Sequence, residues 1–349
     1  MTSRILEKLS RPIVGAPMAG GPSTPALAAA ISKSGGLGFL ASGNKDVALL
    51  EQDIRECAQL LRGEPYGVNF FYPQLHRTDP DAVKLLHRLL AKEYVKAGVP
   101  QPAIPVVDYS NDFLAKQDVV FAACKEGYGP KVVSSSFGCF TAEEIRKIHS
   151  VGAEAWASVT SLEETEVALS RGVDALIAQG HEAGGHRLTW DVCETPTPFS
   201  TAELCSMIHA RHPDAVLIAA GGIRTARDVK VALSVGACAV SCGSAFLLSH
   251  EAGTSEANRA MIAAGGKTLS SRAFSGRIAR GIATTFSLSH PDLPCSYPEF
   301  SAMVSPLRKI RGYEYCLVGE RIELIRPGSA REILDYLEGK HVFPTAPCV

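Results

Sequence analysis

The sequence has no long hydrophobic run, and this lack limits where the protein can act. None of its apolar stretches approaches the roughly 20 residues that a membrane-spanning helix needs, although 46% of the 349 residues are hydrophobic. The first residues also lack the apolar core of a secretory signal peptide. We therefore predict a cytoplasmic protein that does not bind membranes.

An excess of charge of one sign is lacking too. The formal net charge is -1 at pH 7, so general electrostatic attraction to nucleic acid is not expected. The ten cysteines form no CxxC pair and no zinc-like Cys/His pattern, and no metal site is predicted. We expect these cysteines to be reduced, with Cys238 and Cys242 in apolar strands acting as small hydrophobic residues.

Short apolar runs alternate with helical patterns along most of the chain. Eight such units predict an α/β fold, a (β/α)8 barrel. A doubly wound sheet, which suits six or seven units, is the alternative. No GxGxxG motif of the dinucleotide-binding kind follows the first predicted strand. The predicted strands span residues 12–18, 38–42, 66–71, 132–137, 154–159, 175–178, 215–220 and 237–242.

This alternation divides the chain into three regions. Residues 1–72 and 131–250 are predicted to form the barrel. Residues 73–130 are too long for an ordinary connection between a strand and a helix, so we expect an inserted, mostly helical cap. Residues 251–349 lack the alternation and are expected to wrap the barrel, cover its mouth and end with a closing helix at 329–338.

The segment 179–186, Gln-Gly-His-Glu-Ala-Gly-Gly-His, directly follows the sixth predicted strand. Active sites of barrels lie at the C-terminal ends of the strands, and glycines allow close approach of the backbone to a ligand. An ordinary turn with a structural histidine is the alternative. His186 is a candidate general base. His181 is a second candidate or a partner of Glu182, although a surface role is favoured for it.

Glycines also follow the last two predicted strands, as Gly221-Gly222 and Gly243-Ser244. Loops at these positions of a barrel often bind phosphate through backbone N–H groups, and two tight turns are the alternative. A phosphate site would suit a phosphorylated substrate or FMN. Asn69 and Gln179, amides at strand ends, could pair with the edge of a flavin ring.

Two arginines, Arg277 and Arg280, stand three residues apart in the segment SGRIARG (275–281). They could face a carboxylate or another anion. A solvated face of a helix is an equally good interpretation, and the residues alone leave both open.

Taken together, these motifs resemble those of the nitronate monooxygenase family, formerly called 2-nitropropane dioxygenases. The opening PIVGAPM and the later YGVNFF, QGHEAGGHRL, AAGGI and SCGSAF are similar to family motifs in the same order. SGRIARG and SYPEFSAMVSPLR resemble its C-terminal segments. The resemblance spans nearly the whole chain, and the EAGGH motif is quite specific for the family.

The resemblance implies a TIM barrel that holds FMN non-covalently. It implies oxidative denitrification of alkyl nitronates, and of nitroalkanes, to carbonyl compounds and nitrite with O2. His186, which closes the EAGGH motif, would take the α-proton of a neutral nitroalkane. The alternative is an FMN-dependent NAD(P)H:quinone or enoyl-thioester reductase, and a flavin-free barrel acting on a phosphorylated metabolite ranks third. We expect a monomer or homodimer whose partners are small molecules.

The resemblance also carries specific residues over to this chain. The implied flavin-contacting positions are Met18, Asn69, Gln179, Gly184, Gly185, Gly222, Ser241, Cys242, Gly243 and Ser244. Candidate residues of the substrate pocket are Tyr109, His181 and Tyr297. The chain departs from some members of the family, which carry a histidine where Ser134-Ser135-Ser136 stand and a tyrosine and a lysine near Ser301 and Ser305. These departures concern the substrate pocket rather than the flavin site.

Overall fold

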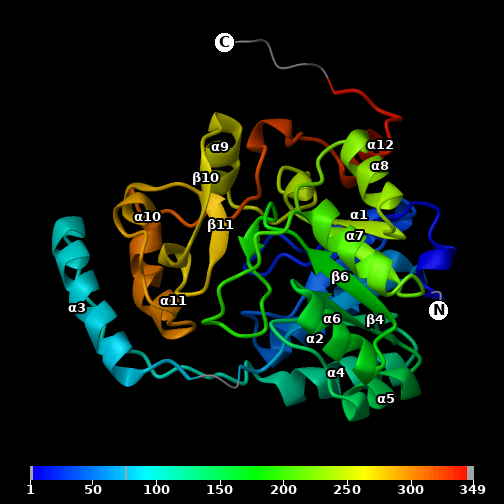
Figure 1. Cartoon of the computed structure of the whole chain (residues 1–349), viewed down its shortest axis with the longest axis horizontal. Coiled ribbons are helices and arrows are strands. Elements are labelled where there is room, and N and C mark those ends of the chain that lie inside the picture. The colour runs from blue at the N-terminus through cyan, green and yellow to red at the C-terminus, as the bar shows by residue number, and fades with distance from the viewer. Residues whose placement is uncertain (1–2, 75–76, 344–349) are drawn as a thin grey trace.

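A computed structural model describes residues 3–74 and 77–343. Its eight parallel strands follow one another in the order β1-β9-β8-β6-β5-β4-β3-β2. A parallel bridge between Val14 and Leu37 joins the first strand to the start of the last and closes the sheet. This is the predicted TIM barrel (Figure 1). The strands are β1 (Ile13–Gly15), β2 (Gly38–Ala41), β3 (Tyr66–Phe71), β4 (Val132–Ser136), β5 (Glu154–Val159), β6 (Ala175–Gln179), β8 (Leu217–Ala220) and β9 (Ala239–Cys242).

The barrel helices surround these strands, and side-chain caps define where most of them begin. The predicted capping box at Thr141 and Glu144 opens α5, and Ser161 caps α6 by accepting from the Glu164 amide. The predicted closing helix, α12, lies against α1 and α8 and so completes the ring. The helices are α1 (Pro25–Lys33), α2 (Val47–Leu61), α4 (Phe113–Lys125), α5 (Ala142–Ser150), α6 (Leu162–Arg171), α7 (Thr201–Arg211), α8 (Ala226–Ser234) and α12 (Ala330–Leu337).

Both faces of the barrel strands are buried, which explains their nearly continuous hydrophobic runs. Val14, Phe39 and Trp156 belong to one buried cluster of strand residues, whereas Leu40 and Val240 pack in a larger cluster that includes the surrounding helices. The barrel is therefore a solid core, and a ligand site must lie at one of its ends.

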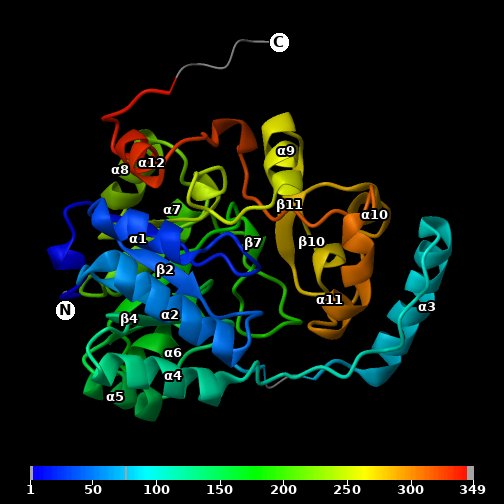
Figure 2. The same ribbon diagram turned by 180° about the vertical axis from the view of Figure 1, so that it is seen from behind.

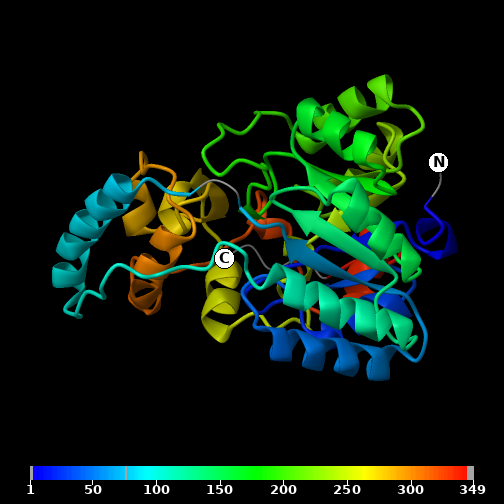
Figure 3. The same ribbon diagram turned by 90° about the horizontal axis from the view of Figure 1, so that it is seen from below.

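Three long segments leave the barrel, each from the C-terminal end of a strand: residues 72–112, 180–200 and 243–329. They meet beside the barrel in what we call the outer lobe, where α3 packs on α11 and β7, β11 and β10 form an antiparallel sheet. Figures 2 and 3 show the lobe from behind and from below. Its elements are α3 (Pro80–Ala97), β7 (Gly185–His186), α9 (Glu256–Ala264), β10 (Thr268–Ser271), β11 (Ala279–Ile282), α10 (Thr285–Ser289) and α11 (Glu299–Val304).

Two sequence-based expectations need correction here. Helix α4, placed in the insertion 73–130, packs on α2, and its Phe113, Val120 and Ala123 lie in the barrel's main core. The excursion therefore ends before α4. Cys238, expected in a buried strand, is exposed just before β9.

In the described part of the chain no helix is both long and apolar enough to cross a membrane.

Candidate active site

A cavity of about 710 Å³ lies between the C-terminal ends of the barrel strands and the outer lobe. Side chains of both regions line it, including Phe137 and Ser158 from the barrel and Ser301, Arg308 and Tyr315 from the lobe. The structure brings most of the predicted site residues together on its wall. Those are Met18, Asn69, Gln179, Gly184, Gly185, His186, Gly222, Ser241, Gly243, Ser244 and Tyr297.

Tyr109 does not line the cavity. Its hydroxyl donates to the Glu299 carboxylate in the outer lobe, and its neighbours Val107 and Asp108 form part of the cavity wall instead. Tyr109 thus joins the first excursion to the segment that carries the pocket residues, a role that sequence position alone did not suggest.

Cys242 and His181 also lie away from the cavity wall. The Cys242 side chain packs in the main barrel core. The His181 side chain is 41% exposed, and its Nδ1 lies 3.7 Å from the Glu320 carboxylate, whereas the Glu182 carboxylate accepts from the Thr201 amide at 2.9 Å. The same glutamate lies 3.1 Å from the guanidinium of Arg280. The surface role favoured for His181 therefore agrees with the structure, and Arg280 does face a carboxylate.

His186 sits in β7, where it pairs with Ala279 of β11. Its Nε2 lies 2.7 Å from the Ser275 hydroxyl. The side-chain NH2 of Gln179 donates to the His186 carbonyl at 3.0 Å, and its side-chain oxygen accepts from the backbone N–H of Leu188 at 2.9 Å. Gln179 therefore holds the backbone directly after the histidine, which helps to fix the position of the candidate base.

The surroundings of His186 keep its ring neutral. Burial, together with the positive charges of Arg277 and Arg308, lowers the pKa of His186 to about 3. The rings of Phe137 and Tyr297 approach the imidazole at centroid distances of 5.8 and 5.5 Å. A neutral imidazole can accept a proton, and the two arginines would stabilise an anion formed beside it.

Arg277 is buried, with 1% of its surface exposed, so a solvated helix face is wrong for it. Its guanidinium donates to the Thr189 carbonyl at 2.7 Å and to the Gln74 side chain. It also lies 4.2 Å from the centre of the Phe137 ring. Burial lowers the pKa of Arg277 to about 10, so the group remains a cation at neutral pH behind the wall of the cavity.

Asn69 is oriented by the serines that distinguish β4. Its Oδ1 accepts hydrogen bonds from Ser134 at 2.8 Å and from Ser136 at 3.2 Å, because β3 and β4 are paired in register at this point. The side-chain oxygen is thereby engaged, and the NH2 group remains as a donor for a ligand.

Another part of the cavity is suited to an anion. Gly221 and Gly222 have φ of +116° and +68°, a conformation that favours glycine. Arg224 is 3% exposed and lines the cavity, yet its Nε and Nη2 atoms have no partner among the described residues. Sequence reasoning missed Arg224; the signal available was a basic residue two positions after the Gly221-Gly222 pair.

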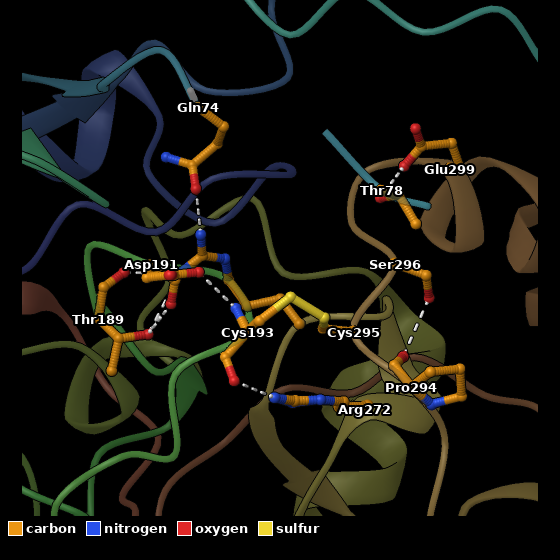
Figure 4. The surroundings of a disulfide bond; sticks show 11 residues. Gln74, Thr78, Thr189, Asp191, Cys193, Arg272, Pro294, Cys295, Ser296 and Glu299 are labelled. Carbon is orange, nitrogen blue, oxygen red and sulfur yellow. Dashed lines mark hydrogen bonds between the residues drawn. A yellow bond between two sulfur atoms is a disulfide. The ribbon is translucent and has the colours of Figure 1, made fainter. Parts of the chain in front are cut away.

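One disulfide is present in the described chain, between Cys193 and Cys295 (Figure 4). The expectation that all cysteines are reduced is therefore wrong. The fold brings the two Cα atoms to 5.2 Å although 102 residues separate them in sequence, so no short motif could reveal the pair.

Known proteins resemble this chain over almost its full length. The family model described as nitronate monooxygenase matches residues 3–330. A nitronate monooxygenase of Paraburkholderia phytofirmans is 33% identical, covering 95% of this chain and 92% of that protein, and one of Pseudomonas aeruginosa is 32% identical, covering 84% of each. The crystal structure of a nitroalkane oxidase from Streptomyces ansochromogenes matches with a TM-score of 0.88 at 31% identity over 97% of both chains. FabK from Thermotoga maritima matches with a TM-score of 0.70 at 25% identity, covering 96% of this chain and 94% of that one.

Proposed function

Because this chain belongs to the nitronate monooxygenase family of oxidoreductases, we propose that it oxidises alkyl nitronates with FMN and O2. The products would be a carbonyl compound and nitrite. The observation that carries the proposal is the arrangement of one cavity. A neutral histidine under the influence of two arginines lies at one part of it, and a buried arginine with two unpaired nitrogen atoms among the described residues lies beside glycine loops at another.

The cavity residues fit FMN on independent grounds. A buried guanidinium with two unpaired nitrogen atoms is unfavourable unless an anion binds there, and Arg224 is such a group. Within the described chain the amide N–H groups of Gly222 and Gly243 have no backbone partner, so both remain available to phosphate oxygens. Arg224 and these loops would hold the phosphate.

The ring of FMN would extend toward the amide side chains. Asn69 offers its NH2 group, since Ser134 and Ser136 occupy its oxygen. Met18 lines the same cavity and offers an apolar contact. When bound, FMN supplies the electron acceptance that the oxidation requires, with O2 as the final acceptor.

The chain's own contribution to the reaction is to bind the anion and to move one proton. His186 would take the α-proton when the substrate is a neutral nitroalkane, and it would not be needed for a nitronate that is already ionised. Arg308 lines the cavity. Together with Arg277, which lies against the Phe137 ring, Arg308 would stabilise the negative charge of the nitronate. Leu188 and Tyr297 would exclude water from the reacting atoms.

A second candidate is an FMN-dependent reductase that uses NAD(P)H on a quinone or an enoyl thioester. The likeness to FabK favours it. The two activities separate in one assay: nitrite release from the anion of 2-nitropropane in air, measured with and without NADPH. We expect nitrite without NADPH. Oxidation of NADPH with no nitrite would support the reductase.

A further inference from the structure

A segment of the outer lobe reaches from β11 to the glycine loops of the barrel, and we call its residues 319–321, Gly-Glu-Arg, the clasp. Just before the clasp, the Val318 amide donates to the Arg280 carbonyl of β11 at 3.2 Å. The Glu320 carboxylate of the clasp lies 3.1 Å from the guanidinium of the same arginine. The clasp is thus attached to β11 on one side, by a backbone contact and by a charged one.

On its other side the clasp is bonded to two loops that carry predicted site residues. The Gly319 amide donates at 3.0 Å to the hydroxyl of Ser244, which follows β9. The Glu320 amide donates at 3.2 Å to the carbonyl of Glu182, which belongs to the EAGGH segment after β6. The clasp therefore ties together the loops at the ends of two barrel strands.

Arg321 holds a third loop, the one after β8. Its guanidinium donates to the Gly222 carbonyl and, at 3.0 Å, to the Asp228 carboxylate. The peptide bond that joins Gly222 to Ile223 is trans, and in a trans peptide the C=O and N–H groups point in opposite directions. The Ile223 N–H therefore points away from Arg321, and it has no hydrogen-bond partner among the described residues.

The side of this peptide that faces away from Arg321 is the side of the cavity. Gly222 and Ile223 both line the cavity, whereas Arg321 does not. Arg321 thus fixes the orientation of an amide N–H toward the cavity while lying outside the cavity wall. A peptide turned the other way would present its carbonyl oxygen to the cavity and repel an anion.

The clasp acts on two further donors of the same site. Because the Ser244 oxygen accepts from the Gly319 amide, its own hydroxyl proton is left to donate to an anion. A Cβ atom on residue 319 would lie 2.5 Å from Nη2 of Arg224, and this Nη2 is one of the two Arg224 nitrogen atoms without a partner among the described residues. A side chain at residue 319 would therefore displace the guanidinium.

We propose that the clasp is a positioning element for the anion site, and that Arg321 and Gly319 determine how strongly this site holds a phosphate monoester. Arg321 orients the Ile223 N–H, and Gly319 leaves the Ser244 hydroxyl free and Arg224 in place. The inference rests on the proposed function, because the phosphate expected at the site is that of FMN. Since Arg321 lies outside the cavity wall, it is a positioning residue and does not contact the phosphate.

The first test compares FMN with riboflavin, which has the same ring and ribityl chain but no phosphate. Apoprotein is titrated with each flavin, and binding is followed by quenching of flavin fluorescence. We expect R321A to bind FMN about tenfold more weakly than the wild type, as the loss of one charge-assisted hydrogen bond would give, and to bind riboflavin equally well. Equal weakening for both flavins would mean that Arg321 only maintains the structure of the cavity, and it would overturn the proposal, as would unchanged FMN affinity.

Two further variants separate orientation from charge. R321K keeps the positive charge, but a single ammonium group cannot hold a carbonyl and a carboxylate in the geometry of a planar guanidinium, so we expect it to bind FMN nearly as weakly as R321A. R227A removes an exposed cation from α8 and should retain the wild-type affinity. Full FMN affinity in R321K, or an equal loss in R227A, would show that charge alone matters and would overturn the orienting role.

G319A tests the second part of the clasp. Its methyl group would occupy the space beside Arg224, so FMN binding should weaken about tenfold while riboflavin binding stays unchanged. Thermal unfolding of each apoprotein verifies that the variants fold. The Arg321 side chain is 42% exposed, so R321A keeps the test independent of G319A. Wild-type FMN affinity in folded G319A would contradict the role of Gly319.

Failure of the clasp and failure of the proposed function give different results. A wild-type protein that binds FMN no more tightly than riboflavin would overturn the phosphate site, and the clasp with it. A wild-type protein that prefers FMN, together with an R321A variant that prefers it to the same degree, would overturn the clasp alone.

Discussion

The Nε2 atom of His186 lies 2.7 Å from the Oγ atom of Ser275. Ser275 is fully buried, and its hydroxyl donates to the Arg277 carbonyl at 3.2 Å. Because the hydroxyl proton is committed to that carbonyl, Oγ accepts from Nε2–H of the histidine. This pattern leaves the lone pair on Nδ1, which has no hydrogen-bond partner among the described residues, and makes Nδ1 the basic atom.

The first prediction concerns this pair. H186Q should lower kcat/KM for neutral nitroethane by about 10²–10⁴-fold, since a positioned general base contributes that much, and should leave turnover of the nitronate nearly unchanged. S275A should reduce only the nitroalkane reaction, by about tenfold, because the ring loses its fixed tautomer. Steady-state rates on both forms of the substrate provide the measurement.

Ser270 supplies the control for the serine variant, since it is exposed in β10. S270A should match the wild type on both substrates. If S275A lowered the nitronate and nitroalkane rates equally, Ser275 would act on the structure of the cavity and not on the base.

The second prediction concerns pH. Burial and the charges of Arg277 and Arg308 lower the pKa of His186 to about 3, so the neutral, basic form persists at pH values well below the ordinary histidine pKa of about 6.5. We expect kcat/KM for a neutral nitroalkane to stay level as pH falls from 7 to about 5. An acid limb with its midpoint between about 6 and 7 would mean that the histidine titrates as an ordinary one.

The third prediction concerns Arg224. R224A should weaken FMN binding about 10–100-fold, because a buried charge-assisted contact to phosphate contributes about 1.5–3 kcal/mol. Titration of apoprotein with FMN, followed by quenching of flavin fluorescence, measures this. Arg227 is exposed on α8, and R227A is the matched control that should bind FMN normally. Equal affinity of R224A and R227A would place the phosphate elsewhere.

The fourth prediction concerns stability. C193S/C295S should lower the free energy of unfolding by about 2–4 kcal/mol, since the disulfide closes a long loop and restricts the unfolded chain. Thermal or urea denaturation of oxidised protein and of the variant gives the comparison. C238S should unfold like the wild type. A double variant as stable as the oxidised protein would show that the cross-link contributes nothing to the free energy of unfolding.

The barrel could be predicted because its signals are local. Most strands are short apolar runs followed by a capped helix, and Thr141 or Ser161 marks the helix start within a few residues. The glycine loops after β8 and β9 and the EAGGH segment follow directly from strand ends, where barrels place ligand sites. His186 and most implied flavin positions accordingly line the cavity.

The outer lobe could not be predicted in the same way, because its contacts join distant segments. Arg277 is buried against Thr189 and Gln74, and neither partner is near it in sequence. The pairing of β7 with β11 and the Cys193–Cys295 bond are equally non-local. A spacing of three positions between two arginines cannot distinguish a buried cation from a solvated one when such distant partners decide the outcome.

The most direct test of the proposed function is a visible absorption spectrum of the purified protein under anaerobic conditions, recorded before and after addition of the anion of 2-nitropropane. We predict a flavin spectrum that changes on addition of the nitronate, remains unchanged with NADPH, and recovers with release of nitrite when air is admitted. A flavin spectrum indifferent to the nitronate but bleached by NADPH, or no flavin after reconstitution with FMN, would contradict it.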